Sequence, residues 1–192
     1  MIAPDALLTA YASGWFPMAV GEGEIRWYSP DPRGIIPLDT FHVPSRLARS
    51  LRKAGFEIRV NSNFRGVITA CATREDADGN WIDEQIIESY CELHATGSAH
   101  SVETWQNDIM VGGLYGVSLR GAFFGESMFH NVTDASKAAL VALVDKLRGG
   151  GYLLLDTQWV TEHLLQFGAV EIPRRRYLQM LEDALKVQGR FT

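Results

Sequence analysis

The sequence has few of the features that mark secreted or membrane proteins. It contains two cysteines, Cys71 and Cys91, with no Cys-x-x-Cys motif, so we expect free thiols in a reducing compartment. No apolar run approaches the ~20 residues that a membrane-spanning helix needs. The first residues also lack the basic start and small-residue cleavage site of a signal peptide. We therefore expect a cytoplasmic protein without a membrane segment.

Metal-binding patterns are missing as well. The five histidines form no His-x-x-x-His or His-Glu-x-x-His pattern, so we expect neither a metal site nor a metal cofactor. A net charge of −5 argues against a protein that coats nucleic acid with its whole surface, although it is compatible with a local basic face. At 192 residues, 46% of them hydrophobic, the chain is long enough for one domain with a small appended lobe.

Glycine and proline divide the chain at about residue 44. Their frequency before this point predicts a small N-terminal lobe over residues 1–44, with a short helix and irregular or strand-like pieces. Residues 45–192 show hydrophobic periodicity, which predicts regular elements. We expect helices over 45–55 (capped by Ser45), 82–95, 135–148 (capped by Asp134), 160–167 and 174–186, and strands over 56–60, 100–105, 109–119, 122–126 and 152–155. Together they predict an α+β fold, a mixed and mainly antiparallel sheet covered by helices.

The helix predicted over 45–55 is amphipathic. Leu47, Leu51 and Ala54 fall on one side of it. The other side is basic and carries Arg46, Arg49, Arg52 and Lys53. A solvated helix face is the commoner explanation of such a charge run. The absence of interleaved acids nevertheless favours binding to a polyanion through its phosphates.

The most informative stretch follows the buried strand predicted over 152–155. It ends in Asp156, Thr157 and Gln158, and ligands of open α/β sheets gather beyond the carboxyl ends of strands. Strand periodicity puts Asp156 and Gln158 on the same side. Glu126 ends a second predicted strand, so two carboxylates can meet at one sheet edge. Alternatively, Asp156 caps the next helix and Glu126 pairs with a lysine, since structural ion pairs also collect at strand ends.

Aromatic and apolar residues surround these polar positions. Phe123, Phe124, Met128 and Phe129 flank Glu126, where they are either core residues or the walls of an apolar pocket. Three tryptophans are candidates for stacking on a nucleic-acid base, although a single tryptophan more often packs in a core. They are Trp27, Trp81 and Trp105.

Eight strings, in order along the chain, resemble those of the leucyl/phenylalanyl-tRNA–protein transferase family. Two of them are Trp27-Tyr28-Ser29-Pro30-Asp31-Pro32-Arg33-Gly34 and Asp156-x-Gln158. The other six lie within residues 11–18, 90–105, 112–117, 124–129, 135–140 and 168–174. Each string alone is weak evidence, whereas eight in the same order are specific. Thr157 replaces a cysteine that is common in the family, which argues against a thiol mechanism.

The resemblance implies a fold related to the acetyltransferases, with a small N-terminal lobe. It implies that Asp156 and Gln158 lie at the reaction centre with Glu126 beside them. It also implies that Leu114, Phe123 and Leu155 line an amino-acid pocket, that Trp27 and Trp105 lie near the terminal adenosine of the tRNA, and that the basic helix binds tRNA. The implied partners are Leu- or Phe-tRNA and proteins with N-terminal Arg or Lys, which the added residue marks for degradation. No cofactor is implied.

Two other functions compete with this interpretation. An acyl-CoA-dependent N-acetyltransferase of the same fold needs a glycine-rich pyrophosphate loop between a strand and a helix. The chain lacks that loop at the expected place, where Gly125-Glu126-Ser127 puts an acid. A non-catalytic RNA-binding module needs only the basic helix. Such a module has no use for the cluster of Glu126, Asp156 and Gln158.

Overall fold

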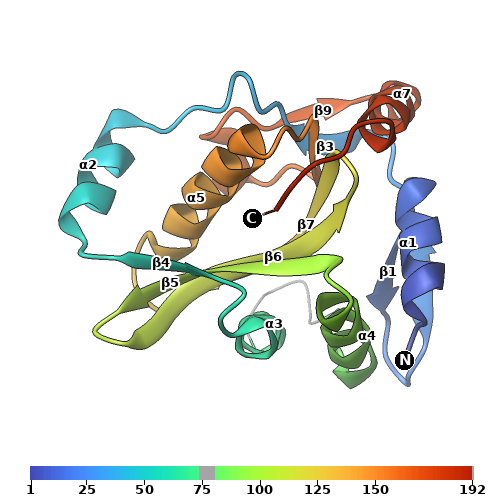
Figure 1. Cartoon of the computed structure of the whole chain (residues 1–192), viewed down its shortest axis with the longest axis horizontal. Coiled ribbons are helices and arrows are strands. Elements are labelled where there is room, and N and C mark those ends of the chain that lie inside the picture. The colour runs from blue at the N-terminus through green and yellow to red at the C-terminus, as the bar shows by residue number, and fades with distance from the viewer. Residues whose placement is uncertain (74–80, 192) are drawn as a thin grey trace.

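A seven-stranded mixed sheet runs through the protein, whose computed structural model describes residues 1–73 and 81–191 (Figure 1). The strand order is β4-β5-β6-β7-β8-β3-β9, and a separate two-stranded sheet pairs β1 with β2. The strands are β1 Phe16–Ala19, β2 Ile25–Tyr28, β3 Arg33–Ile36, β4 Glu57–Val60, β5 Ala99–Gln106, β6 Ile109–Leu119, β7 Ala122–His130, β8 Leu154–Gln158 and β9 Val170–Ile172.

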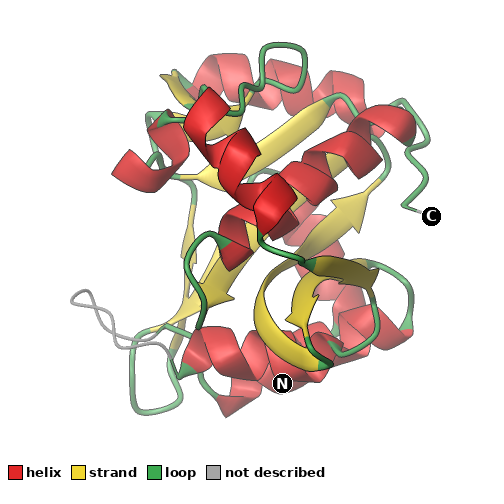
Figure 2. Ribbon diagram, turned by 90° about the vertical axis from the view of Figure 1, so that its left-hand side faces the viewer, coloured by secondary structure: helices red, strands yellow, loops and turns green. Residues whose placement is uncertain are grey.

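Helices cover both faces of this sheet (Figures 1 and 2). The helices are α1 Pro4–Ala12, α2 Ser45–Lys53, α3 Phe64–Ala72, α4 Glu84–Ala95, α5 Ala135–Gly149, α6 Glu162–Leu165 and α7 Arg174–Leu185. One core lies between the sheet and α1, α3, α4 and α7. The other lies between the sheet, α2 and α5, with α6 at its border. No helix of the described residues is long and apolar enough to cross a membrane.

The sheet confirms the predicted α+β fold. Strands β4 to β7 form an antiparallel meander, β7 pairs with β8 in parallel, and β8, β3 and β9 are again antiparallel. The N-terminal 44 residues contribute to both sheets. β1 and β2 form the small one, whereas β3 lies inside the large one, between β8 and β9. The division of the chain at residue 44 remains a prediction.

Several element ends differ from the predictions for local reasons. Pro44 stands at the N-cap of α2 and Ser45 is its first helical residue, so Ser45 does not cap it. Asp134 stands at the N-cap of α5, but its carboxylate binds Lys137 and Ser50 instead of the helix backbone. Helix α3 was not predicted, although Asn63 caps it by accepting a hydrogen bond from the backbone N–H of Gly66.

Candidate active site

A cavity of about 440 Å³ lies where two neighbouring parallel strands separate. β7 and β8 pair only from Ala122 to Phe124, opposite Leu154 to Asp156. Beyond this point the two strands line the cavity instead of pairing with each other. The lining residues are Gly125, Glu126, Ser127, Met128 and His130 from β7, and Leu155, Thr157, Gln158 and Trp159 from β8 and the position after it. The volume is typical of small-molecule sites, which span roughly 300–1,000 Å³.

The walls of the cavity combine an apolar side with a few polar groups. Leucines form the apolar side, namely Leu114, Leu140, Leu143, Leu155 and Leu164. Thr157 Oγ1 and His163 Nε2 are buried at the wall and make no hydrogen bond within the described part of the chain, so they are available to a ligand. Burial, with help from nearby positive charge, lowers the pKa of His163, which favours the neutral imidazole.

Glu126 reaches the cavity wall through an irregularity in β7. It is the extra residue of a β-bulge, because its two neighbours pair with Tyr115 and Gly116 on β6. The bulge reverses the alternation of side chains along the strand. Phe124 before it and Phe129 after it face the same core. They are five positions apart, so in a regular strand they would face opposite sides of the sheet. This reversal explains why the periodicity predicted a strand that ends at Glu126, whereas β7 continues to His130.

Asp156 is held by four hydrogen bonds in a part of the site that solvent does not reach. Arg33 donates to both carboxylate oxygens, from Nε to Oδ1 at 2.9 Å and from Nη2 to Oδ2 at 2.6 Å. The Tyr177 hydroxyl donates to Oδ2 at 2.7 Å and the backbone N–H of Gln158 to Oδ1 at 2.9 Å. Both Arg33 and Asp156 are 0% exposed. Asp156 therefore does not cap a helix, and its charge is paired.

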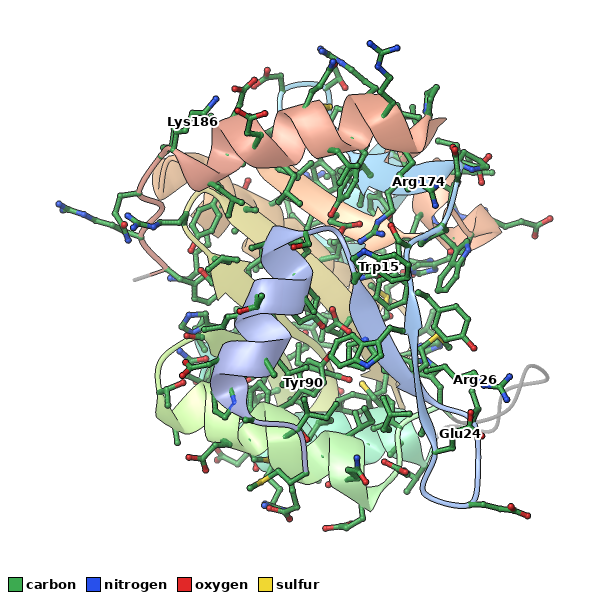
Figure 3. All side chains as sticks on the ribbon, turned by 90° about the vertical axis from the view of Figure 1, so that its right-hand side faces the viewer. Trp15, Glu24, Arg26, Tyr90, Arg174 and Lys186 are labelled. Atoms are coloured by element: carbon green, nitrogen blue, oxygen red, sulfur yellow. The ribbon has the colours of Figure 1, made fainter. Side chains whose placement is uncertain are left out.

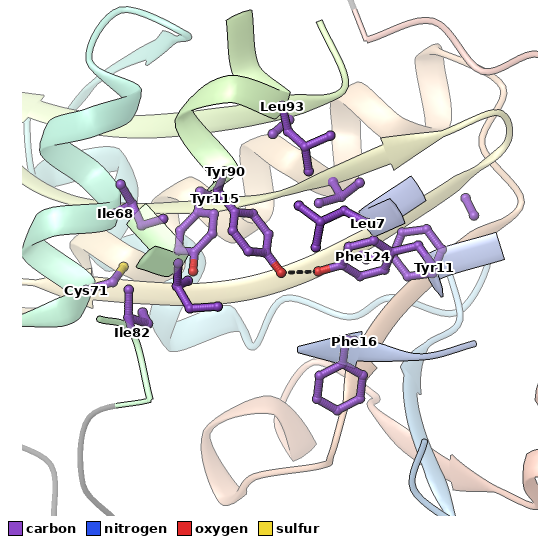
Figure 4. Packing of buried hydrophobic residues seen from close by; sticks show 14 of the residues in the cluster. Leu7, Tyr11, Phe16, Ile68, Cys71, Ile82, Tyr90, Leu93, Tyr115 and Phe124 are labelled. Atoms are coloured by element: carbon purple, nitrogen blue, oxygen red, sulfur yellow. Dashed lines mark hydrogen bonds between the residues drawn. The ribbon is translucent and has the colours of Figure 1, made fainter. Parts of the chain in front are cut away.

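Glu126 is joined to Gln158 and to two buried tyrosines. Its Oε1 accepts a hydrogen bond from Gln158 Nε2 at 3.2 Å, and its Oε2 accepts one from the Tyr90 hydroxyl at 3.3 Å. The Tyr90 hydroxyl also forms a short hydrogen bond with that of Tyr11 (Figure 4). Burial raises the pKa of Glu126 to about 8, against the opposing effect of the tyrosine hydrogen bonds. The expected alternative, a lysine partner for Glu126, does not occur among the described residues.

The structure thus brings Glu126, Asp156 and Gln158 together, but only part of the expected pocket. Leu114 and Leu155 line the cavity. Phe123 is not among its lining residues and stacks on Phe191, with ring centroids 5.3 Å apart.

The two tryptophans expected near an adenosine also lie away from the cavity. Trp27 on β2 is 39% exposed and lines a shallow groove beside α1, where Figure 3 shows the exposed Trp15. Trp105 on β5 lies under the guanidinium of Arg59, 4.4 Å from the ring centroid. The tryptophans that line the cavity are Trp81 and Trp159.

Sequence reasoning missed four residues that build the polar part of the site. They are Tyr11, Arg33, Tyr90 and Tyr177. Tyr11, Arg33 and Tyr90 all lie within the strings that carried the family resemblance, which was the available signal. Nothing in their local sequence distinguishes them from surface or ordinary core residues.

The predicted basic face of α2 is exposed to solvent. Arg46, Arg49, Arg52 and Lys53 are all exposed, and none forms an ion pair with another residue of the described ranges. The opposite side of the helix packs Leu47 into the core under α5. A hydrogen bond of 2.9 Å from Ser50 to Asp134 joins α2 to the start of α5. No group of metal-ligating side chains occurs among residues 1–73 and 81–191.

Comparison with known proteins shows that the protein is an aminoacyltransferase. The sequence model of the leucyl/phenylalanyl-tRNA protein transferase matches residues 35–182, and the model of its N-terminal domain matches residues 1–31. The chain belongs to this family.

Curated relatives cover nearly the whole chain. A leucyl/phenylalanyl-tRNA–protein transferase of Rhodopseudomonas palustris (strain HaA2) is 56% identical over 96% of this chain and 84% of its own length. The enzyme of the same name from Herpetosiphon aurantiacus is 54% identical over 99% and 98%. Among solved structures, FemX has the same fold, with a TM-score of 0.57 and 13% identity over 93% of this chain and 71% of that chain.

Proposed function

We propose that this protein transfers Leu or Phe, and less well Met, from aminoacyl-tRNA to the α-amine of proteins that begin with Arg or Lys, and so marks them for degradation in the cytoplasm. The cavity between β7 and β8 is the observation that carries this proposal. Its leucine wall suits an apolar amino-acid side chain. Gln158 and Glu126 at the same cavity suit the ester carbonyl and the amine that react there.

Aminoacyl transfer mainly requires that the acceptor amine and the ester carbonyl are aligned. An aminoacyl ester is already activated, so transfer needs no ATP, metal or covalent enzyme intermediate. The enzyme must hold the acceptor amine, whose free pKa is about 7.7–8.0, neutral and in line with the carbonyl, and must stabilise the oxyanion that forms. Asp156 fixes the backbone of Gln158, and the hydrogen bond to Glu126 orients its amide. Gln158 then positions the reacting amine or carbonyl.

Contacts between elements support a path for the tRNA from the basic helix to the cavity. Ser50 of α2 binds Asp134 at the start of α5, and Ser136, two residues further along in the first turn, lines the cavity. Phosphates held on α2 therefore lie next to α5, the helix that borders the site. For the terminal base, Trp81 and Trp159 replace Trp27 and Trp105 as the stacking candidates, worth ~1–3 kcal/mol for one stacked base.

The preference for a cationic acceptor rests on one carboxyl group. Because Arg33 pairs with Asp156, Glu126 is the acidic residue that lines the cavity within the described chain. Burial raises the pKa of Glu126 to about 8, but a nearby cation favours its ionised form, so an acceptor that begins with Arg or Lys promotes the carboxylate that attracts it.

The test is transfer of labelled Leu from Leu-tRNA to a peptide that begins with Arg, beside the same peptide with an acetylated N-terminus. We expect label on the free peptide only, and a rate reduced by about 10²-fold in Gln158→Ala. Label transferred from acetyl-CoA, but not from Leu-tRNA, would instead identify an acetyltransferase. A near-normal rate in well-folded Gln158→Ala would contradict the assignment of the site.

A further inference from the structure

Two carboxyl groups adjoin Gln158, but only one of them is open to a substrate. Asp156 is 0% exposed, does not line the cavity, and has both oxygens occupied by the guanidinium of Arg33 and two further donors. A proton on Asp156 requires at least one of these hydrogen bonds to break in the interior. Asp156 therefore has neither the access nor the free lone pair that a proton acceptor needs.

Glu126 has both. It lines the cavity and is partly accessible from it. The hydrogen bonds that Gln158 and Tyr90 donate to it are long, at 3.2 and 3.3 Å. No residue of the described chain forms an ion pair with it. The carboxyl group thus stands beside the amide that positions the reacting groups, with room to approach an amine.

We propose that Glu126, and not Asp156, is the catalytic residue that takes the proton from the attacking α-amine. In this step the amine nitrogen forms a bond to the ester carbonyl carbon, and its proton passes to the Glu126 carboxylate. The bond from that carbon to the ribose oxygen then breaks, and Glu126 returns the proton to this oxygen. Atoms and charge balance without a further reactant. The proposal rests on the transfer function proposed above and assigns its proton acceptor.

The surroundings of Glu126 fit this role. Burial raises its pKa to about 8, close to that of a free α-amine, and proton transfer is most efficient between matched groups. Asp156 raises the pKa further, whereas the tyrosine hydroxyls and Arg33 lower it. The groups that face Glu126 are Tyr11 from α1, Arg33 from β3, Tyr90 from α4, and Asp156 and Gln158 from β8. The active carboxylate form therefore increases as the pH rises through 8.

The test is the pH dependence of kcat with an aminooxy acceptor, whose nitrogen stays neutral over the range in which Glu126 titrates. We expect kcat of the wild type to rise with an apparent pKa of about 8. In the isosteric variant Glu126→Gln, kcat should fall by about 10²-fold and this rise should disappear, while KM for Leu-tRNA changes less than threefold. Glu88→Gln, the same change at an exposed glutamate, should keep both the rate and the pH profile.

The outcomes separate this proposal from the function on which it rests. A Glu126→Gln variant that keeps the pH profile and a kcat within threefold of the wild type would overturn the role of Glu126. Partial recovery of kcat in Glu126→Ala with added formate, which can occupy the vacated space, would support it further. A wild-type protein that transfers no Leu to any acceptor would instead overturn the proposed function.

Discussion

Arg33 carries a guanidinium group into a part of the molecule that solvent does not reach. It comes from β3, which lies between β8 and β9 in the large sheet, and meets Asp156 on the neighbouring β8. Burial acts to lower the pKa of Arg33, but the hydrogen bonds and charge of Asp156 outweigh it and raise that pKa. A third donor, Nη1, binds the backbone carbonyl of Gly14 at 2.9 Å. One side chain thus ties the N-terminal segment to the strand that carries Gln158.

Removal of this cation should therefore destabilise the whole protein. Arg33→Met leaves Asp156 buried without its main partner, and loss of one member of a buried pair costs about 3–5 kcal/mol. The free energy of unfolding, measured by urea denaturation, should fall by this amount. Arg26→Met removes a guanidinium that pairs with Glu24 at the surface, as Figure 3 shows, and should leave the urea midpoint unchanged. Equal effects of the two variants would argue against a special role of Arg33.

Glu126 should make stability depend on pH. Its pKa is about 8 in the folded protein and about 4.5 in the unfolded chain, so the folded state binds the additional proton between these values. Stability is therefore lost as the pH rises from 5 to 8. Glu126→Gln removes this titration, so its free energy of unfolding should fall less over that range than that of the wild type. Parallel curves from urea denaturation at each pH would show that the pKa of Glu126 is not raised.

Sequence reasoning found part of this site and missed the rest for physical reasons. Polar residues at the end of an apolar strand are visible in a short window, which is how Asp156 and Gln158 were identified. The burial of Arg33 depends on a partner 123 positions away and on the order of strands in the sheet. Local periodicity carries no information on either. The family resemblance, and not periodicity, placed Phe123 in the cavity wall, whereas this residue packs against Phe191.

At the scale of secondary-structure elements, the parting of β7 and β8 creates the site. Parallel strands that stayed paired to their ends would fill this space with backbone hydrogen bonds. The bulge at Glu126 bends β7 and reverses its alternation. The sequence correctly predicts strands at β7 and β8. It does not predict the bulge, because a periodicity argument assumes that strand pairing continues without interruption. The alternation of side chains along β7 is regular before residue 126, and after this residue it is shifted by one position.

The proposed binding of tRNA by helix α2 can be tested separately from the transfer reaction. Charge reversal by Arg49→Glu with Arg52→Glu should weaken tRNA binding and reduce the dependence of affinity on salt, because fewer phosphate contacts release counterions. Transfer from an aminoacyl-adenosine donor should be nearly unchanged, since this donor lacks the phosphates. The measurement is tRNA affinity over a range of salt concentrations, beside kcat/KM with both donors.

A matched control carries the same change of charge elsewhere. Arg65→Glu with Lys186→Glu alters two exposed basic residues outside α2 and should leave the salt dependence as it is in the wild type. Equal losses of both donors in the α2 variant would show that α2 supports the fold instead of binding tRNA.

At the scale of the whole molecule, the fold class was predictable and the arrangement of its parts was not. Helix and strand periodicity sufficed for a mixed sheet covered by helices. The position of β3 within the large sheet was not visible, because a four-residue strand among prolines has no periodicity to read. Yet this position brings Arg33 to Asp156 and the N-terminal segment to the site, with Phe16 and Met18 of β1 lining the cavity.

In the proposed function, the cavity between β7 and β8 selects the apolar amino acid that is transferred. The most direct measurement compares kcat/KM for one tRNA body carrying Leu, Phe, Met, Ala or Lys, with a peptide acceptor that begins with Arg. Burial of an apolar side chain contributes ~25 cal/mol per Å² removed from water, and a pocket discriminates by only ~1–3 kcal/mol per missing methylene.

We therefore expect efficient transfer of Leu and Phe and detectable transfer of Met. Ala should be at least about 10-fold poorer than Leu, and Lys should fail because its charge loses water in the cavity. Leu155→Ala, which enlarges the cavity, should reduce Leu transfer more than it changes tRNA affinity. Equal transfer of Ala and Leu by the wild type would contradict the account, because selection would then be made on the tRNA and not in the cavity.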